Sequence, residues 1–126
     1  MSPSSIFHIA EPARWHQAQA DGSYTGSTRG SDLRGVGFIH CSYRHQVEAV
    51  ANHLYADWSD ELLLLEADPE KIPAEIRVER LDGAPDEFPH IYGPLPTAAV
   101  SAVHTLTRQA DGWVLPGGGP SEEFGA

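Results

Sequence analysis

Short apolar runs and one clear helical period organise the first half of the chain. Residues 6–10 form a run typical of a strand, and Glu11-Pro12 opens a helix that reaches about Ala20, since proline is favoured in a first helical turn. Between residues 47 and 55 apolar side chains recur at i, i+3, i+4, i+7 and i+8, which predicts a second helix. The continuous apolar run 62–67 predicts a strand buried on both faces.

The rest of the pattern is mostly strand. Residues 37–42 predict a strand before the second helix, with Ser42 as the helix N-cap, and residues 21–35 read as a loop rich in glycine and serine. Later strands are predicted at 76–81, 90–93, 100–107 and 113–115, the last two joined as a hairpin through Asp111-Gly112. Two early helices followed by strands favour an α+β fold with mostly antiparallel sheets.

Length and composition fit one domain. The chain has 126 residues, of which 40% are hydrophobic, enough for one core but not for two. We expect a single domain over residues 1–115. Residues 116–126 are rich in Gly, Pro and Glu without an apolar period, and predict a flexible tail.

The charge, the motifs and the apolar runs of the chain argue against several classes of function. The net charge is -10 and the eight Lys and Arg residues are scattered, so nucleic-acid binding is not expected. No glycine-rich dinucleotide or P-loop motif is present. No apolar run is long enough to span a membrane, the start of the chain lacks the features of a secretory signal, and a single cysteine cannot form an internal disulfide. These features together predict a cytoplasmic protein.

Three histidines share one pattern. Side chains alternate across a strand, so His8 points away from Phe7 and Ile9, and His40 with Ser42 points away from Ile39 and Cys41. In the same way, His90 and Tyr92 lie opposite Ile91. We expect the three imidazoles to line one polar cleft, in which case replacing His40 or His90 with Ala should cost about 1 kcal/mol or less. The alternative is that each histidine is a partly buried, hydrogen-bonded strand residue.

Two other readings of these residues are less favoured. Three histidines suggest zinc, but no His-x-His or His-x-x-x-His pair or carboxylate at ligand spacing accompanies them, so no metal site is expected. Cys41 adjoins His40, yet neighbours in a strand face opposite ways, so the pair is not a catalytic dyad. A buried, unreactive thiol is the expected state of Cys41.

The same segments resemble a known family. Ile6-Phe7-His8-Ile9, Gly37-Phe38-Ile39-His40-Cys41-Ser42, Gln46 and Phe88-Pro89-His90-Ile91-Tyr92-Gly93-Pro94-Leu95 resemble the signature of the domain of unknown function 952 family, small and mostly bacterial proteins. The resemblance covers about residues 6–106. It implies a fold similar to the ADP-ribosyltransferases, with split antiparallel sheets, helices packed on them and a cleft between.

The resemblance also implies roles for single residues. In the transferases, a His or Arg on the first strand holds the nicotinamide ribose or amide, and His8 occupies the matching place. The segment from Gly37 to Ser42 resembles the motif that flanks the nicotinamide pocket. The third motif usually supplies a catalytic Glu, but here His90 and Tyr92 stand there instead.

These observations lead to one functional hypothesis and one alternative. The hypothesis is a histidine-lined cleft that binds a nucleotide-like small molecule, with NAD suggested by the fold analogy, and that serves as a ribosyl or phosphoryl transferase if it catalyses a reaction. The candidate catalytic residues are His8, His40 and His90, and the candidate cofactor-binding residues are Ser42, Gln46, Tyr92 and Tyr24. The alternative is a non-catalytic protein-interaction or regulatory domain that reuses the fold.

Overall fold

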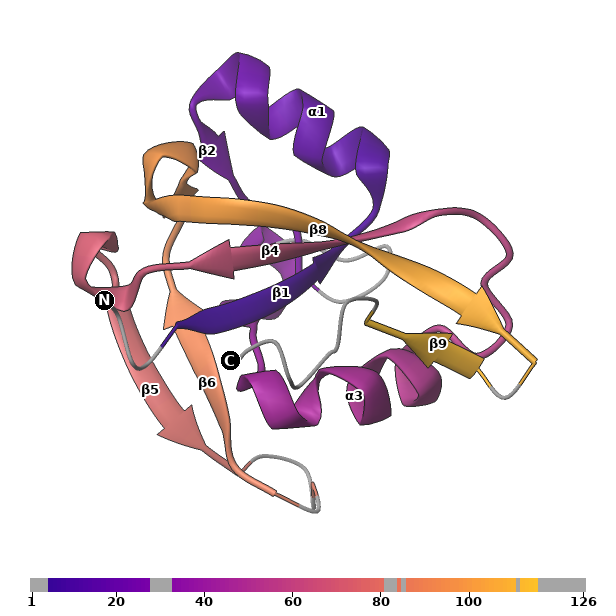
Figure 1. Cartoon of the computed structure of the whole chain (residues 1–126). Helices are drawn as coiled ribbons and strands as arrows, with labels where there is room; N and C mark the ends of the chain where they lie inside the picture. Colours follow the sequence, from indigo (N-terminus) through magenta and orange to yellow (C-terminus); the bar gives the residue numbers. More distant parts are fainter. Residues whose placement is uncertain (1–4, 28–32, 81–83, 85, 111, 116–126) are drawn as a thin grey trace.

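A four-stranded sheet runs through the centre of the molecule in this computed structural model, which describes residues 5–27, 33–80, 84, 86–110 and 112–115. Its strands lie in the order β1 (Ile6–Ala10), β4 (Leu62–Ala67), β8 (Val100–Gln109) and β9 (Gly112–Val114), and each neighbouring pair is antiparallel. Helix α1 (Pro12–Asp21) packs on one face of this sheet and α3 (Val47–Leu54) on the other (Figure 1).

Two smaller sheets flank the central one. The first has the order β3 (Ile39–His40), β6 (Phe88–Tyr92) and β5 (Glu75–Glu79), and the second pairs β2 (Ser23–Tyr24) with β7 (Leu95–Pro96); both are antiparallel. Helix α2 (Leu33–Val36) is one turn long, and 3₁₀ turns occupy Arg44–Gln46, Pro69–Lys71 and Thr97–Ala99. The predicted α+β class with mostly antiparallel sheets is therefore confirmed.

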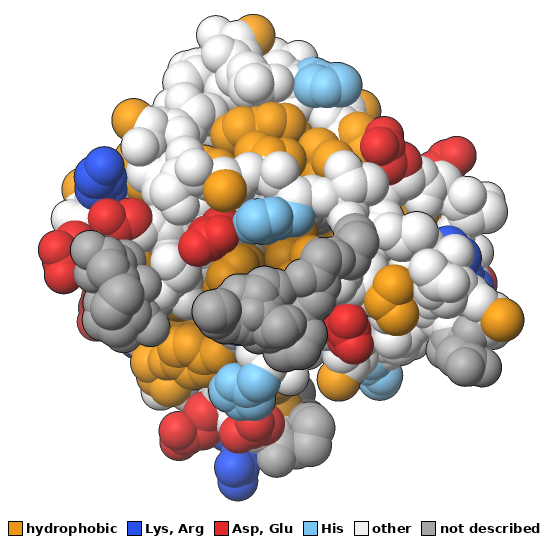
Figure 2. All heavy atoms as spheres, viewed as in Figure 1, with side chains coloured by type: hydrophobic (Ala, Val, Ile, Leu, Met, Phe, Trp, Pro, Cys, Tyr) orange, Lys and Arg blue, Asp and Glu red, His pale blue; other side chains and the backbone are white. Residues whose placement is uncertain are grey.

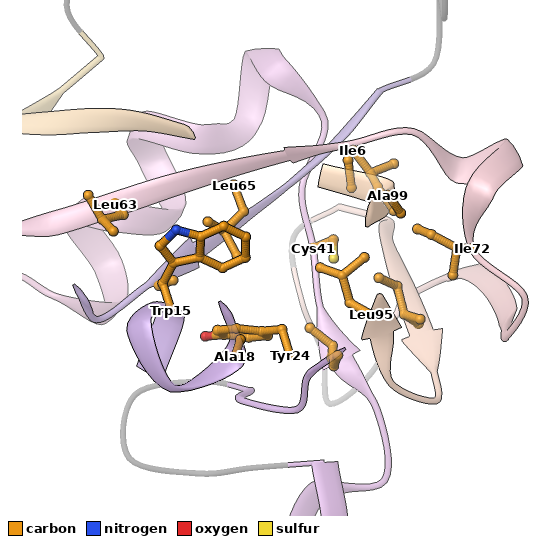
Figure 3. Packing of buried hydrophobic residues seen from close by; sticks show 14 residues of the cluster. Ile6, Trp15, Ala18, Tyr24, Cys41, Leu63, Leu65, Ile72, Leu95 and Ala99 are labelled. Carbon is orange, nitrogen blue, oxygen red and sulfur yellow. The ribbon is translucent and has the colours of Figure 1, made fainter. Parts of the chain in front are cut away.

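Strand β4 contributes to the hydrophobic clusters on both faces of the central sheet. Leu63 and Leu65 belong to the cluster on the α1 face, where Figure 3 shows them beside Trp15. Leu62 and Leu64 belong to the cluster on the α3 face. Because side chains alternate along a strand, the apolar run fills both clusters at once. The prediction of a strand buried on both faces is confirmed.

Helix α3 starts differently from the prediction. Its buried residues Val47, Val50 and Ala51 match the predicted helical period. Ser42, however, is not its N-cap, because Ser42 lies in an extended bridge with Phe7. A 3₁₀ turn precedes the helix instead, and the side-chain oxygen of Gln46 accepts a hydrogen bond from the backbone N–H of Tyr43 at 2.9 Å. The prediction for Ser42 was wrong because its backbone has a sheet partner.

Strand β1 is buried on both faces, contrary to the expected single apolar face. Phe7 and Ile9 pack in the cluster under α3, while Ile6 and Ala10 pack in the cluster under α1. His8 therefore shares the second, α1-facing side of the strand and is only 3% exposed. The sequence pattern could not show that a helix would cover this side as well.

The segment from Ile39 to Ser42 joins two sheets. The predicted strand 37–42 shortens to β3, which pairs with β6, and the N–H of Cys41 still donates to the carbonyl of Pro89 at 2.9 Å. Ser42 then exchanges two backbone hydrogen bonds with Phe7 of β1, at 2.7 and 2.8 Å. Within four residues the chain passes from the three-stranded sheet to the central sheet.

The segment predicted as loop 21–35 contains more structure than expected. It holds β2, which pairs with β7, and the start of α2. The predicted stop of the first helix is confirmed, since Gly22 takes a φ of 84° and its N–H bonds the carbonyl of Ala18 at 2.7 Å. The predicted tail 116–126 lies outside the described residues. No helix among the described residues is long and apolar enough to cross a membrane.

Candidate functional site: a chain of histidines

His8 sits at the centre of β1 with both ring nitrogens engaged. Its Nδ1 lies 2.6 Å from the backbone oxygen of His40, and its Nε2 lies 3.0 Å from the hydroxyl of Tyr24. A carbonyl oxygen only accepts, so Nδ1 carries the proton and donates it. Burial lowers the pKa of His8 to about 4, so the ring is neutral at pH 7 and Nε2 accepts from Tyr24.

Tyr24 reaches His8 from β2, inside the segment that the sequence predicted as loop. The side chain is 1% exposed, and burial raises the pKa of its hydroxyl, which therefore stays protonated and donates. Gly26 makes room for this hydroxyl, because a Cβ atom at residue 26 would lie 2.6 Å from the Tyr24 oxygen. Tyr24, a candidate cofactor-binding residue, thus contacts the first candidate catalytic histidine.

His40 and His90 meet across the pairing of β3 with β6, where they are register partners. Nδ1 of His40 lies 3.1 Å from Nε2 of His90. The ring of Phe38 stacks on His90 at 4.2 Å between centroids, and Phe88 lies beside His40 at 4.9 Å. Burial, with His90 and His8 nearby, lowers the pKa of His40 to about 4, so His40 is neutral at pH 7.

The far side of His90 contacts a carboxylate that the sequence reasoning missed. Nδ1 of His90 lies 3.0 Å from Oε1 of Glu79, and the same oxygen accepts a short hydrogen bond from the hydroxyl of Tyr92. The Tyr92 and His90 hydrogen bonds hold the pKa of Glu79 below its usual range, so this side chain is ionised. The guanidinium of Arg77 lies over the Tyr92 ring at 4.4 Å.

A signal for Glu79 was present in the sequence. In the run Glu75-Ile76-Arg77-Val78-Glu79, period two places the three charged residues on one face. The register of β5 with β6 then sets this face beside that of Phe88, His90 and Tyr92. The sequence shows which residues share a face of each strand. It does not show the register that aligns β5 with β6, because the turn between the strands does not fix it.

A small open pocket borders this histidine chain. Its space is about 240 Å³, counting the part open to solvent. The lining combines a polar part with an apolar part: His8, Ser27, His40, Ser42, Ile9, Val50, Leu54 and Tyr55. Such a lining offers hydrogen-bonding groups on one part and apolar contacts on the other.

The remaining candidates divide between the pocket and the scaffold. Ser42 lines the pocket, and Ser27, which the sequence reasoning missed, lies there and donates to the carbonyl of Phe38 at 2.8 Å. Gln46 is buried and bonds three groups of the protein, namely the backbone N–H of Tyr43, the side chain of Asp86 and the backbone oxygen of Glu87. Its amide therefore secures the turn before α3 to the chain before β6.

Two questions of chemistry concern Cys41 and metals. Cys41 is 1% exposed in the cluster under α1, and burial raises the pKa of its thiol (Figure 3). A neutral buried thiol is a poor nucleophile. Within the part of the chain that the structure describes, no group of three or more His, Cys, Asp or Glu side chains is placed to hold a metal ion.

Comparisons with known proteins place these features in a family. Residues 9–103 match the model of a family described as "Protein of unknown function (DUF952)". The crystal structure of protein CC0527 from Caulobacter crescentus superposes with a TM-score of 0.70 at 30% identity, covering 87% of this chain and 92% of that one. The solution NMR structure of CC0527 gives a TM-score of 0.70 at 28% identity, covering 90% and 93%. A search of curated proteins found no match.

Proposed function

This chain belongs to the DUF952 family, and on that premise we propose that it binds the uncharged end of a nucleotide-like small molecule in the histidine-lined pocket. The observation that carries the proposal is the meeting of His8 and His40, from separate strands, with Ser42 on the polar side of one pocket. His8 uses both ring nitrogens within the protein, whereas the imidazole of His40 keeps one nitrogen for a ligand, beside the hydroxyls of Ser27 and Ser42.

The composition of the lining narrows the class of ligand. Ile9, Val50 and Leu54 give one side on which a flat ring or a sugar can pack, and the histidine and serine groups give hydrogen bonds on the other. No Lys or Arg belongs to the described lining. On the face seen in Figure 2, the described Lys and Arg side chains lie singly towards the periphery. A phosphate gains little here, so the base or ribosyl part is the part that enters.

NAD is the specific ligand that the fold analogy suggests. The sequence resemblance implies an ADP-ribosyltransferase-like fold, and such a fold would place the nicotinamide-ribose end of NAD in a pocket of this kind. The carboxylate of Glu79 lies beside His90 and Tyr92 but outside the pocket lining, so it would influence such a ligand only through His90 and His40.

Catalysis on such a ligand would use His40 as general acid or base. A neutral imidazole within hydrogen-bond reach of a ligand can accept or return a proton near pH 7. His8 is less suited to this step because both of its nitrogens already have protein partners. We therefore assign His8 to orienting His40 and Tyr24, and His40 to contact with the ligand.

The test is a ligand screen read by thermal shift. The panel contains nicotinamide, nucleosides, nucleotides, ADP-ribose and NAD. A ligand at 100 times its Kd should add roughly 2.7 kcal/mol of stability. His40→Ala should abolish that shift, and His16→Ala, on the exposed side of α1, should leave it unchanged. Stabilisation of His40→Ala equal to that of the wild type, or no response to any compound, would count against the pocket.

A further inference from the structure

A continuous chain of hydrogen bonds runs from the pocket to a carboxylate. His40 borders the pocket, its Nδ1 meets Nε2 of His90 at 3.1 Å, and Nδ1 of His90 meets Glu79 at 3.0 Å. Among the described residues, no hydrogen bond reaches Nε2 of His40. The chain thus has a fixed acceptor at one end and an imidazole nitrogen available to a ligand at the other.

The acceptor at one end fixes the protons along the whole chain. An ionised carboxylate only accepts, so Nδ1 of His90 donates to Glu79. When His90 is neutral, its Nε2 carries a lone pair and must receive the Nδ1–H of His40. A neutral His40 has a single N–H, so its Nε2 is then an acceptor. The carboxylate therefore determines which nitrogen of His40 carries the proton, through one intervening ring.

We propose that Glu79 and His90 are positioning residues that let His40 serve as the base of the pocket, by taking over the proton that His40 receives. This inference rests on the proposed function of the same pocket and deepens it, because it names the two residues that act behind His40. Neither residue needs to touch the ligand.

The proton balance of this step is simple. A ligand X–H gives its proton to Nε2 of His40, and the electron pair of the broken bond stays on X. The Nδ1–H bond of His40 breaks, and that proton bonds to Nε2 of His90. His40 stays neutral as the other tautomer, and His90 becomes an imidazolium next to the Glu79 carboxylate. The reverse transfer makes the same chain a proton donor.

This transfer of a proton from His40 to His90, called the relay below, avoids placing a positive charge on the buried ring of His40. A positive charge on this ring is disfavoured by burial, which lowers its pKa to about 4, so His40 alone would be a weak base at neutral pH. On His90 the same charge lies 3.0 Å from an ionised oxygen, where Coulomb attraction offsets the loss of water. The charge ends where a counter-charge is already present.

Other charged and titratable groups lie around this pair. On the neighbouring strand, Arg77 is the register partner of His90 and its guanidinium rests on the ring of Tyr92. Tyr92 donates to Glu79 and helps keep it ionised. His8 approaches His40 from β1 through the backbone oxygen of His40, and it is neutral at pH 7. The counter-charge of a protonated His90 is therefore Glu79.

The experiment reads histidine tautomers directly, by ¹⁵N NMR of the full chain during a pH titration without ligand. In the wild type above neutral pH, His40 should carry its proton on Nδ1. Whenever His90 carries protons on both nitrogens, His40 should carry its proton on Nε2 while its ring stays neutral. In Glu79→Gln the amide can donate to Nδ1 of His90 as well as accept from it, so His40 should no longer be held with its proton on Nδ1 alone. Glu75→Gln, on the same face of β5 but bonded to Arg77, is the matched control and should keep the wild-type tautomer.

Two results would overturn the relay. The first is a wild-type His40 protonated on Nε2 above neutral pH, a measurement that needs no variant to fold. The second is a folded Glu79→Gln protein whose His40 still carries its proton on Nδ1 alone above neutral pH. Since no ligand is present, the outcome is separate from the ligand screen. If the pocket binds no ligand but the relay exists, the tautomer of His40 is still the one predicted above. If the pocket binds a ligand but the relay does not exist, the tautomer of His40 differs from that prediction.

Discussion

His40 and His90 face each other across two antiparallel strands, with Nδ1 of one 3.1 Å from Nε2 of the other. The ring of His40 is neutral and partly exposed, whereas the ring of His90 is 3% exposed and bonded to the carboxylate of Glu79. The two histidines, which the sequence treated as equivalent, therefore differ in what they hold together. Their replacement should have different consequences for stability.

Replacing His90 should destabilise the fold clearly. His90→Ala removes a buried ring stacked on Phe38 and leaves Glu79 and His40 without a hydrogen-bond partner, so we expect a loss of about 2 kcal/mol or more in the free energy of unfolding. Urea denaturation at pH 7 measures it. The strand pattern alone predicted about 1 kcal/mol or less. A loss that small would show that the ring adds little to the packing.

Replacing His8 should be at least as costly. His8→Ala leaves the Tyr24 hydroxyl and the His40 carbonyl without their partner inside a closed core, and we expect a loss of about 3 kcal/mol. His16→Ala, exposed on α1, should stay within about 0.5 kcal/mol of the wild type. The two variants are compared by denaturant melts in one buffer. Equal stability of both would contradict the buried, doubly bonded state of His8.

Stability should fall as the pH drops below about 6.5. In the folded protein, burial lowers the pKa of His8 and of His40 to about 4, whereas an unfolded histidine titrates near 6.5. Between these values the unfolded chain binds more protons than the folded one, so acid favours unfolding. Each histidine should then remove about 2 kcal/mol of stability between pH 7 and pH 5. Unfolding free energies measured at both pH values check this, and a flat profile would refute it.

Cys41 should be inert in the native protein. Its side chain is 1% exposed, and burial raises the pKa of the thiol, so almost no thiolate meets solvent. A thiol reagent should label Cys41 only at the rate at which the protein unfolds, and rapidly in urea. Fast labelling of the folded protein at pH 7 would show that the cluster under α1 opens.

Gly26 should tolerate no side chain. A Cβ atom there would lie 2.6 Å from the hydroxyl oxygen and 2.8 Å from Cζ of Tyr24, which is held in place by His8. Gly26→Ala should therefore push the Tyr24 hydroxyl away from His8 and cost about 1 to 3 kcal/mol. Thr25→Ala, at the exposed neighbouring position, is the control. The NMR signals of the His8 ring report the displacement, and unchanged signals in Gly26→Ala would contradict it.

The parts of the fold that the sequence predicted well depend on local periodicity. The apolar run of β4 and the helical spacing of α3 are complete within a few residues, so the pattern alone shows which sides are buried. The pairing of His8, His40 and His90 was anticipated as a shared cleft, because alternation along each strand is also local. The structure places His8 and His40 at the pocket, whereas His90 is not among the lining residues and contacts His40 through a hydrogen bond.

What the sequence did not reveal depends on register and on long-range covering. Glu79 reaches His90 only through the alignment of β5 with β6, and Tyr24 reaches His8 only because β2 pairs with β7 under α1. The burial of the second face of β1 depends on the packing of α1. None of these relationships has a periodic signature, and the mistaken N-cap role of Ser42 has the same origin, since its partner is the distant Phe7.

The passage of residues 39–42 from one sheet to another sets a limit on how this chain can vary. Adding or deleting one residue between His40 and Ser42 would rotate every following side chain to the opposite face, while the pairings with β6 and β1 hold both ends in place. Turns at the surface can absorb insertions without such conflict. Among relatives we therefore expect length changes to collect in the turns, and the spacing between the histidine and the serine to stay fixed even where neighbouring side chains diverge.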